Sequence, residues 1–134
     1  MTEFNQKAAE LRNVTDVHYN CAQAVIIPFA DKIGIDEEKL FKLTSNFGSG
    51  MKRGATCGAI SAGLMVLGLF GVDDAGTIGE YYNNLKANHE GKLDCVDLLR
   101  LNKEKGGDRK THCDGMIQEV ITLVEKILTD KGII

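Results

Sequence analysis

Residues 46–71 constrain the fold more than any other part of this sequence. They read NFGSGMKRGATCGAISAGLMVLGLFG, a glycine-rich loop followed by the most apolar segment of the chain. The apolar run, residues 55–72, approaches the length of a membrane-spanning helix, but glycines and Ser61 interrupt it and no aromatic belt flanks it. The pattern therefore predicts a helix buried in the core, with the other elements packed around it, and no membrane partner.

The glycine-rich half, residues 48–54, carries two adjacent cations, Lys52 and Arg53. It follows a predicted helix rather than a strand and lacks the GKS or GKT ending of a P-loop, so a nucleotide site is not indicated. We interpret its glycines as a device for close approach of the backbone to another element. The small residues that follow Cys57 favour tight contact between helices.

Cys57 is predicted to lie in the first turn of the apolar helix. Unpaired amide groups, the positive end of the helix dipole and Lys52 or Arg53 would favour its thiolate there. The other interpretation is a small buried hydrophobe, because free cysteine is among the most buried residue types. On this stretch alone both interpretations stay open.

Apolar residues recur at helical spacing along the rest of the chain, and no segment alternates apolar and polar residues for long enough to be a strand. The predicted helices span about residues 3–13, 17–33, 37–46, 56–71, 73–91, 93–101 and 111–130. The sequence thus predicts one all-α domain over residues 1–134, a single compact helical bundle of about five to seven helices.

The second predicted helix contains Pro28, which should kink it because the ring removes one hydrogen bond and clashes with the preceding turn. Thr15 or Asp16 offers an N-cap for this helix, and Gly34 a C-cap. The longest polar stretch is residues 102–110, which we expect to form a mobile, solvated loop.

The composition excludes some classes of function. A net charge of -3 argues against a nucleic-acid-binding protein, which would normally carry a basic face. The polar N-terminal segment lacks the charged and apolar regions of a secretory signal, so the protein is expected to be cytoplasmic. In that compartment cysteines are more often reduced, metal-bound or catalytic than joined in structural disulfides.

The candidates for chemistry are Cys21, Cys57, Cys95 and Cys113, each predicted on a different helix. They are at least 18 residues apart, which excludes CxxC zinc ribbons and thioredoxin-like motifs. A shared site would have to be assembled by tertiary packing, as helix bundles do with inward-pointing side chains. Four independent core cysteines are the alternative, and the sequence does not choose among the three disulfide pairings.

Two histidines stand near these cysteines. His18 precedes Cys21 by three positions and would share its helix face, and His112 adjoins Cys113. Either histidine could serve as a metal ligand or as a base that keeps a thiol ionised. A partly exposed histidine at a helix end, without such a role, is the alternative for each.

The segments NCAQAV (residues 20–25) and FGSGMKRGATCGAISAGLMVLGL (residues 47–69) and the two later cysteines form a known pattern. Together they resemble the C_GCAxxG_C_C family of putative redox-active proteins, small bacterial and archaeal proteins. The likeness extends from about Asn20 to the C-terminal helix. The Thr56-Cys57-Gly58-Ala59 segment departs from the Gly-Cys-Ala order in the family's name.

The resemblance implies thiol/disulfide or electron-transfer chemistry through Cys21, Cys57, Cys95 and Cys113. The leading hypothesis makes Cys57 the activated thiolate and Cys21 its partner, with Cys95 and Cys113 as a second pair or as additional ligands. The alternative is a metal-binding or iron–sulfur module in which the four thiolates, with His18 or His112 as further candidates, hold a metal ion or cluster.

Other questions stay open at this stage. The redox partner and the electron donor are unknown, and so is the oligomeric state, for which a homodimer is compatible with the sequence. Whether the protein is an enzyme is also undecided, and the enzymatic form would be a thiol-dependent oxidoreductase. A helical interaction protein with merely structural cysteines is the third alternative. The absence of a CxxCH motif argues against covalently attached haem.

Overall fold

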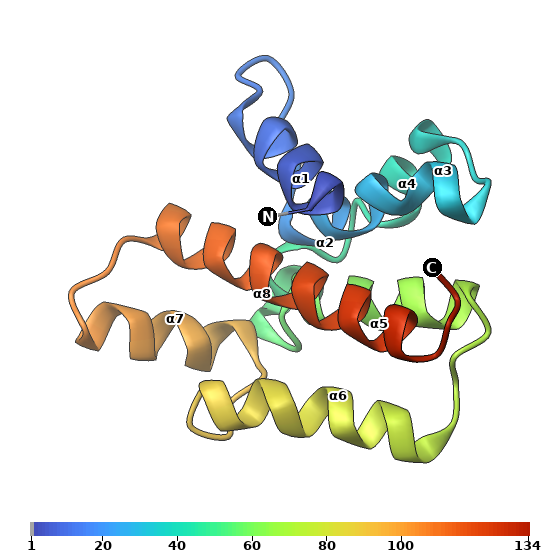
Figure 1. Ribbon diagram of the computed structural model, residues 1–134. Helices are drawn as coiled ribbons and strands as arrows, with labels where there is room; N and C mark the ends of the chain where they lie inside the picture. Colours follow the sequence, from blue (N-terminus) through green and yellow to red (C-terminus); the bar gives the residue numbers. More distant parts are fainter. Residues whose placement is uncertain (1) are drawn as a thin grey trace.

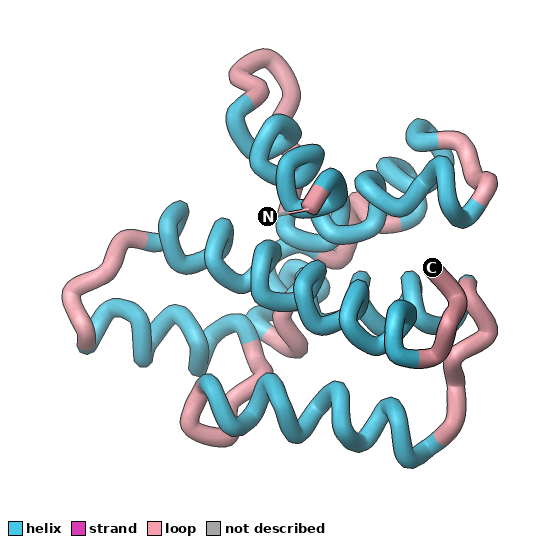
Figure 2. The backbone as a smooth tube through the Cα atoms, viewed as in Figure 1, coloured by secondary structure: helices cyan, strands magenta, loops and turns pink. Residues whose placement is uncertain are grey.

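The computed structural model describes residues 2–134, and this part of the chain is all-helical, with no β-strand (Figures 1 and 2). Its α-helices are α1 (Glu3–Asn13), α2 (Cys21–Ile26), α3 (Ala30–Ile33), α4 (Glu37–Leu43), α5 (Gly58–Leu69), α6 (Ala75–Asn88), α7 (Cys95–Glu104) and α8 (Arg109–Asp130). The predicted all-α class is confirmed. The eight α-helices of residues 2–134 exceed the predicted five to seven.

The additional α-helix comes from the segment around Pro28. The single kinked helix predicted over residues 17–33 is instead three elements, namely α2, a 3₁₀ turn η1 (Ile27–Phe29) and α3. Proline lacks the N–H that would continue the α-helical ladder, so a tighter turn replaces it. Gly34 ends α3 in the left-handed conformation, as predicted.

The start of α2 also differs from the prediction. Asn20, rather than Thr15 or Asp16, is the N-cap. Its side chain accepts a hydrogen bond from the Gln23 amide, and the Gln23 side chain accepts one from the Asn20 amide, at 2.8 Å each. This capping box satisfies two amides at the helix start and fixes Cys21 as the first helical residue.

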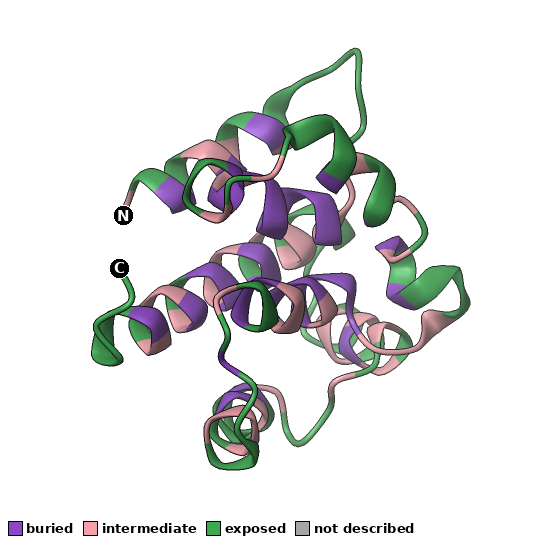
Figure 3. Ribbon diagram, turned by 90° about the vertical axis from the view of Figure 1, so that its right-hand side faces the viewer, coloured by how far each residue is buried: buried purple, intermediate pink, exposed green. Residues whose placement is uncertain are grey.

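Helix α5 is a core element, as its apolar sequence predicts. It contacts α2 and α8, and α8 runs between the group of α1 to α4 and the pair α6 and α7 (Figure 1). The Tyr81 hydroxyl donates to the Ile60 carbonyl at 2.8 Å, and a Cβ on Gly63 would lie 2.2 Å from that hydroxyl oxygen. The buried residues, purple in Figure 3, lie on the facing sides of the central helices. Among residues 2–134, no helix has the length and apolarity needed to cross a membrane.

The glycine-rich loop makes a left-handed turn, labelled η2 (Gly50–Gly54), before α5. Ser49, Met51 and Lys52 all have φ between 54° and 57°, a conformation that L-residues rarely adopt. A Cβ on Gly50 would lie 2.2 Å from the Ala55 carbonyl oxygen, and one on Gly58 would lie 2.5 Å from that of Phe47. The Gly50 contact lies within the loop itself, whereas a Cβ on Gly48 would lie 2.7 Å from the Asn20 Cβ at the start of α2, so Gly48 is the loop glycine that fits close approach to another element.

The polar segment before α8 is shorter than predicted. Helix α7 continues to Glu104 and α8 begins at Arg109, so only residues 105–108 connect them. The Asp108 carboxylate caps α8 by accepting from the Thr111 amide at 3.0 Å. Arg109 and Lys110 consequently belong to the first turn of a long helix rather than to a solvated loop.

Candidate functional site

Three of the four cysteines lie at helix starts. Cys21 is the first residue of α2, Cys57 is the N-cap of α5, and Cys95 is the first residue of α7, whereas Cys113 lies in the second turn of α8. All four are free thiols. The predicted placement on four different helices is confirmed, with Cys57 at the boundary of its helix.

Cys21 and Cys113 are neighbours. Interaction with the Cys113 thiol lowers the pKa of Cys21, more than burial raises it, and the Arg12 guanidinium lowers it further. The same interaction with Cys21 raises the pKa of Cys113 well above its usual range. Cys21 is therefore the thiol that ionises first, with Cys113 as the protonated donor beside it. The structure pairs Cys21 with Cys113, whereas the sequence favoured Cys57 as its partner.

Backbone pairing joins the segments that carry Cys57 and Cys95. Thr56 and Asp94 form an isolated antiparallel bridge, in which the Cys57 amide donates to the Leu93 carbonyl at 2.9 Å. The Cys95 amide donates to the Ala55 carbonyl at 2.7 Å. This pairing joins the starts of α5 and α7, so that residues 38 positions apart in sequence lie side by side.

Burial dominates the chemistry of Cys57, which is 5% exposed. Desolvation raises its pKa to about 11, and interaction with the backbone amides of Ile60 and Ala59 only partly opposes this effect. This burial argues against the prediction that Cys57 is the activated thiolate. Burial raises the pKa of Cys95 as well.

Lys52 and Arg53 do not act on Cys57. The Lys52 ammonium donates to the Asn46 side-chain oxygen at 2.8 Å, and neither residue is among the causes of the pKa shift of Cys57. The left-handed turn carries both side chains to exposed positions. The proximity of these cations to Cys57 in sequence is thus not proximity in space.

The four thiols form one neighbourhood. Electrostatic interaction with Cys57 and Cys95 affects the pKa of Cys21, and interaction with Cys95 and Cys113 affects that of Cys57. Within residues 2–134, however, no three His, Cys, Asp or Glu side chains are grouped closely enough to hold a metal ion. Thiolates suit a soft metal, but the side-chain contact found among these thiols is that of Cys21 with Cys113.

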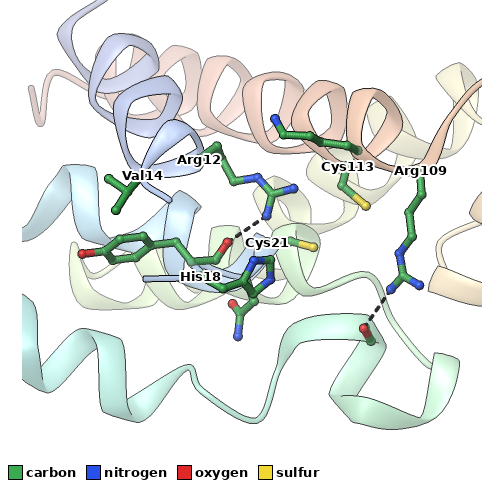
Figure 4. A pocket seen from close by; sticks show the side chains of 10 residues that line it. Arg12, Val14, His18, Cys21, Arg109 and Cys113 are labelled. Carbon is green, nitrogen blue, oxygen red and sulfur yellow. Dashed lines mark hydrogen bonds between the residues drawn. The ribbon is translucent and has the colours of Figure 1, made fainter. Parts of the chain in front are cut away.

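An open pocket of about 420 Å³ gives solvent access to Cys21 and Cys113 (Figure 4). Its wall is formed by residues from α1, the following loop, the glycine-rich loop and α8. The lining residues are Arg12, Val14, His18, Tyr19, Asn20, Cys21, Ser49, Arg109, Lys110 and Cys113. Thus the pocket contains one thiol pair, while Cys57 and Cys95 do not line it.

Arg12 organises one side of this pocket. Its guanidinium pairs with the Asp114 carboxylate at 2.7 Å and donates to the Tyr19 carbonyl at 2.8 Å, and its side chain is 11% exposed. These contacts tie α1 to α8 and hold the non-helical segment that ends at Asn20. Sequence patterns gave no signal for Arg12, because its partners lie in segments far from it or without regular structure.

Arg109 lies on the opposite side. Its guanidinium donates to the Ser49 hydroxyl at 3.0 Å, the hydrogen bond drawn as a dashed line from Arg109 in Figure 4. Its charge lowers the pKa of Cys95 and Cys113 against larger opposing effects. Sequence analysis treated Arg109 and Lys110 as solvated. The cap of α8 at Asp108 was the available signal that they begin a helix near Cys113.

The two candidate histidines, His18 and His112, lie in different surroundings. His18 is not helical, so it does not share a helix face with Cys21, but it lines the same pocket. The pKa of His112 is lowered by burial and by His89, and Glu119 opposes this. His112 therefore belongs to a polar group with His89 and Glu119 rather than to the thiols.

Comparison with known proteins identifies the family of this chain. Neither the curated proteins nor the solved structures contain a match to this chain. Residues 19–127 match the model of the family described as "Putative redox-active protein (C_GCAxxG_C_C)". The matched range contains all four cysteines and extends from the loop before α2 into α8. The chain therefore belongs to the C_GCAxxG_C_C family.

Proposed function

We propose that this chain is a cysteine-based redox protein in which Cys21 and Cys113 form the pair that reacts with an external partner. The observation that carries the proposal is the pairing of these two thiols in an open pocket beside Arg12 and Arg109. A thiolate is the nucleophile in exchange with disulfides, and cationic surroundings favour it. Membership of the family is consistent with this chemistry.

The reaction follows from the split ionisation of the pair. The Cys21 thiolate attacks one sulfur of an external disulfide, whose S–S bond breaks and releases one thiolate, leaving a mixed disulfide on Cys21. The Cys113 thiol then loses its proton to solvent and attacks the Cys21 sulfur, which releases the second thiolate. The protein pair is oxidised by two electrons, and the external disulfide is reduced to two thiols.

Cys57 and Cys95 form the second pair of the proposed site. They have no contact with the pocket, so oxidising equivalents would reach them by internal exchange with the first pair rather than from solvent. Burial, which raises the pKa of both thiols, keeps them protonated while the first pair reacts.

Mass mapping of disulfides tests the function directly. Reduced protein would be treated with bis(2-hydroxyethyl) disulfide, quenched in acid, alkylated and digested. We expect a Cys21–Cys113 linkage as the first product, with Cys57 and Cys95 recovered as alkylated thiols. In the Cys113→Ser variant the reaction should stop at the mixed disulfide on Cys21. Four thiols that never pair, or a first linkage that excludes Cys21, would contradict the proposal.

A metal or iron–sulfur module is the second candidate, favoured by the electrostatic influence of the four thiols on one another, although the four would have to move closer together, since no three of them within residues 2–134 are grouped closely enough to hold a metal ion. Cys21, Cys57, Cys95 and Cys113 would hold the group, which would supply electron transfer or a structural tie. Anaerobic purification with elemental analysis and absorption spectroscopy tests this candidate. Stoichiometric iron or zinc that is lost in single Cys→Ser variants would support it, and protein that resists reconstitution would exclude it.

We further propose that residues 1–134 form one compact helical bundle in the cytoplasm. Helix α8 contacts α1, α2, α5, α6 and α7, which favours one cooperative unit. The reducing cytoplasm would keep the first pair available for exchange. A single unfolding transition in urea, coincident by circular dichroism and tyrosine fluorescence, would support the single domain, and two separate transitions would contradict it.

A further inference from the structure

We propose that the pocket over Cys21 and Cys113 binds small disulfides that carry a carboxylate, with Arg109 as the cation that receives this group. The inference rests on the proposed function and adds to it the chemical class of the co-substrate. It is carried by the size of the pocket, the charges that line it and the contacts that these charges already make.

The size and charge of the pocket favour a small anion. At about 420 Å³ it falls within the range of pockets that hold small molecules. Among its lining residues, Arg12, Arg109 and Lys110 are cations, and no carboxylate lines it within residues 2–134. The N-terminal end of the α8 dipole adds positive potential on the same side.

The three cations of the pocket differ in the ion pairs that they already form. Arg12 and Lys110 both pair with the Asp114 carboxylate, at 2.7 and 2.8 Å. Arg109 forms no ion pair within residues 2–134, and its recorded side-chain contact is the hydrogen bond to the Ser49 hydroxyl. A guanidinium has five N–H donors in a planar fork, which suits bidentate binding of a carboxylate. Arg109 is thus the cation available to a ligand.

The position of Arg109 would place a bound carboxylate near the reacting thiols. It lies close enough to Cys113 to lower the pKa of that thiol, and Ser49 holds it from the glycine-rich loop. A carboxylate bound at Arg109 leaves the attached disulfide over the thiol pair. The Cys21 thiolate then attacks the nearer sulfur and releases one carboxylate-bearing thiolate. Attack by Cys113 on Cys21 releases the second half, so the pair supplies the two electrons.

A charge series of small disulfides tests the inference. The probes are dithiodiglycolate, bis(2-hydroxyethyl) disulfide and cystamine, which are anionic, neutral and cationic. Rate constants for oxidation of the reduced protein would be measured by quenched alkylation and mass spectrometry. For the native chain we expect the order anionic, neutral, cationic, from fastest to slowest. The ratio of anionic to neutral rate should fall in about 0.5 M salt, because salt screens exposed charges.

Variants assign the preference to Arg109. In Arg109→Gln we expect the anionic-to-neutral ratio to fall about tenfold, the loss of one charge-assisted contact. The ratio is the measured quantity because a change in thiol reactivity affects both probes equally. Lys39→Gln is the matched control, since it removes one exposed charge from α4, away from the pocket, and should change the ratio less than about twofold.

A non-reactive analogue separates binding from exchange. Thiodiglycolate lacks the S–S bond, and we expect it, but not thiodiethanol, to shift the amide resonances of Ser49, Arg109 and Cys113 in the native chain. If no disulfide oxidises Cys21 but thiodiglycolate binds, the proposed function fails and the anion site stands. If exchange occurs without charge preference, or Arg109→Gln retains the preference, the inference is overturned and the function stands.

Discussion

The two thiol pairs of this protein have the same side chains but opposite surroundings. Cys21 and Cys113 share an open pocket with arginine side chains, and interaction within the pair lowers the pKa of Cys21. Cys57 and Cys95 stand at the starts of α5 and α7, which the backbone bridge of Thr56 with Asp94 joins, and burial raises the pKa of both thiols.

The difference shows that a helix start does not by itself activate a cysteine. Cys57 lies at the N-cap of α5, with amides that favour its thiolate, but desolvation is the larger effect. Cys21 gains a thiol donor and a nearby guanidinium, and these outweigh its own burial. The identity of the reactive thiol is thus decided by which charges and donors reach the sulfur.

The largest expected effect comes from removing each nucleophile in turn. In Cys21→Ser, oxidation by bis(2-hydroxyethyl) disulfide should slow at least about a hundredfold, because serine supplies no thiolate. In Cys57→Ser the initial rate should stay near that of the native chain. Stopped reactions analysed by mass spectrometry measure both rates. Equal losses in the two variants would remove the distinction between the pairs.

The buried pair should make the protein sensitive to alkali. The pKa of folded Cys57, about 11, lies above the ordinary value of 9.0, so the native state holds this proton more tightly than the unfolded state. The resulting stability is present below pH 9 and is lost as the pH rises through 11, by about 2–3 kcal/mol. Urea unfolding at pH 8 to 11 measures this decline.

The matched variant for this measurement is Cys57→Ala. Other groups titrate in the same range, including Tyr81, whose pKa is also raised by burial, so only the difference between the two chains is informative. The variant should lose less stability between pH 9 and 11 than the native chain. Parallel declines would show that Cys57 is not held protonated by the fold.

The third prediction concerns Arg12, which lies beside the pair Cys21 and Cys113. Arg12→Gln should raise the pKa of Cys21, because the guanidinium favours its thiolate, and should therefore slow alkylation by iodoacetamide at pH 7. Loss of the contacts to Asp114 and the Tyr19 carbonyl should cost about 1.5–3 kcal/mol of unfolding free energy.

The pH dependence of alkylation, followed residue by residue, separates these two effects. A shifted profile at Cys21 with an unchanged profile at Cys57 is the expected result. If the profile of Cys21 does not move while stability falls, Arg12 has only a structural role.

The smallest effect is expected at Lys52 and Arg53. These cations are close to Cys57 in sequence but are exposed on the left-handed turn. Lys52→Gln and Arg53→Gln should each change the unfolding free energy by less than about 0.5 kcal/mol. The alkylation profile of Cys57 should stay in place. A clear shift of that profile would restore the sequence-based view that these cations activate Cys57.

Several elements could be predicted because their signals are local. The apolar run over α5, the C-cap at Gly34 and the first helix, residues 3–13, follow from periodicity and cap chemistry. The start of α2 was predicted at the wrong residue. The spacing of Asn20 and Gln23 is that of a capping box, so a local signal for the correct start was present in the sequence.

The sequence predicted the cysteines of the candidate site but not which of them lie together. Cys21, Cys57, Cys95 and Cys113 could be singled out by residue type and by the family pattern, and they do lie near one another. Their pairing could not be predicted, because the partners are brought together by the α5–α7 bridge and by the contact of α2 with α8.

The sequence by itself determined an all-helical chain with an apolar central helix and four cysteines on separate elements. Only the tertiary structure decided that Cys21 is ionised before Cys57 and that Arg12 and Arg109 line the pocket of the reactive pair. The physical reason is range. Helix periodicity and caps act over a few residues, whereas desolvation and electrostatic interaction depend on neighbours that folding brings together from distant parts of the chain.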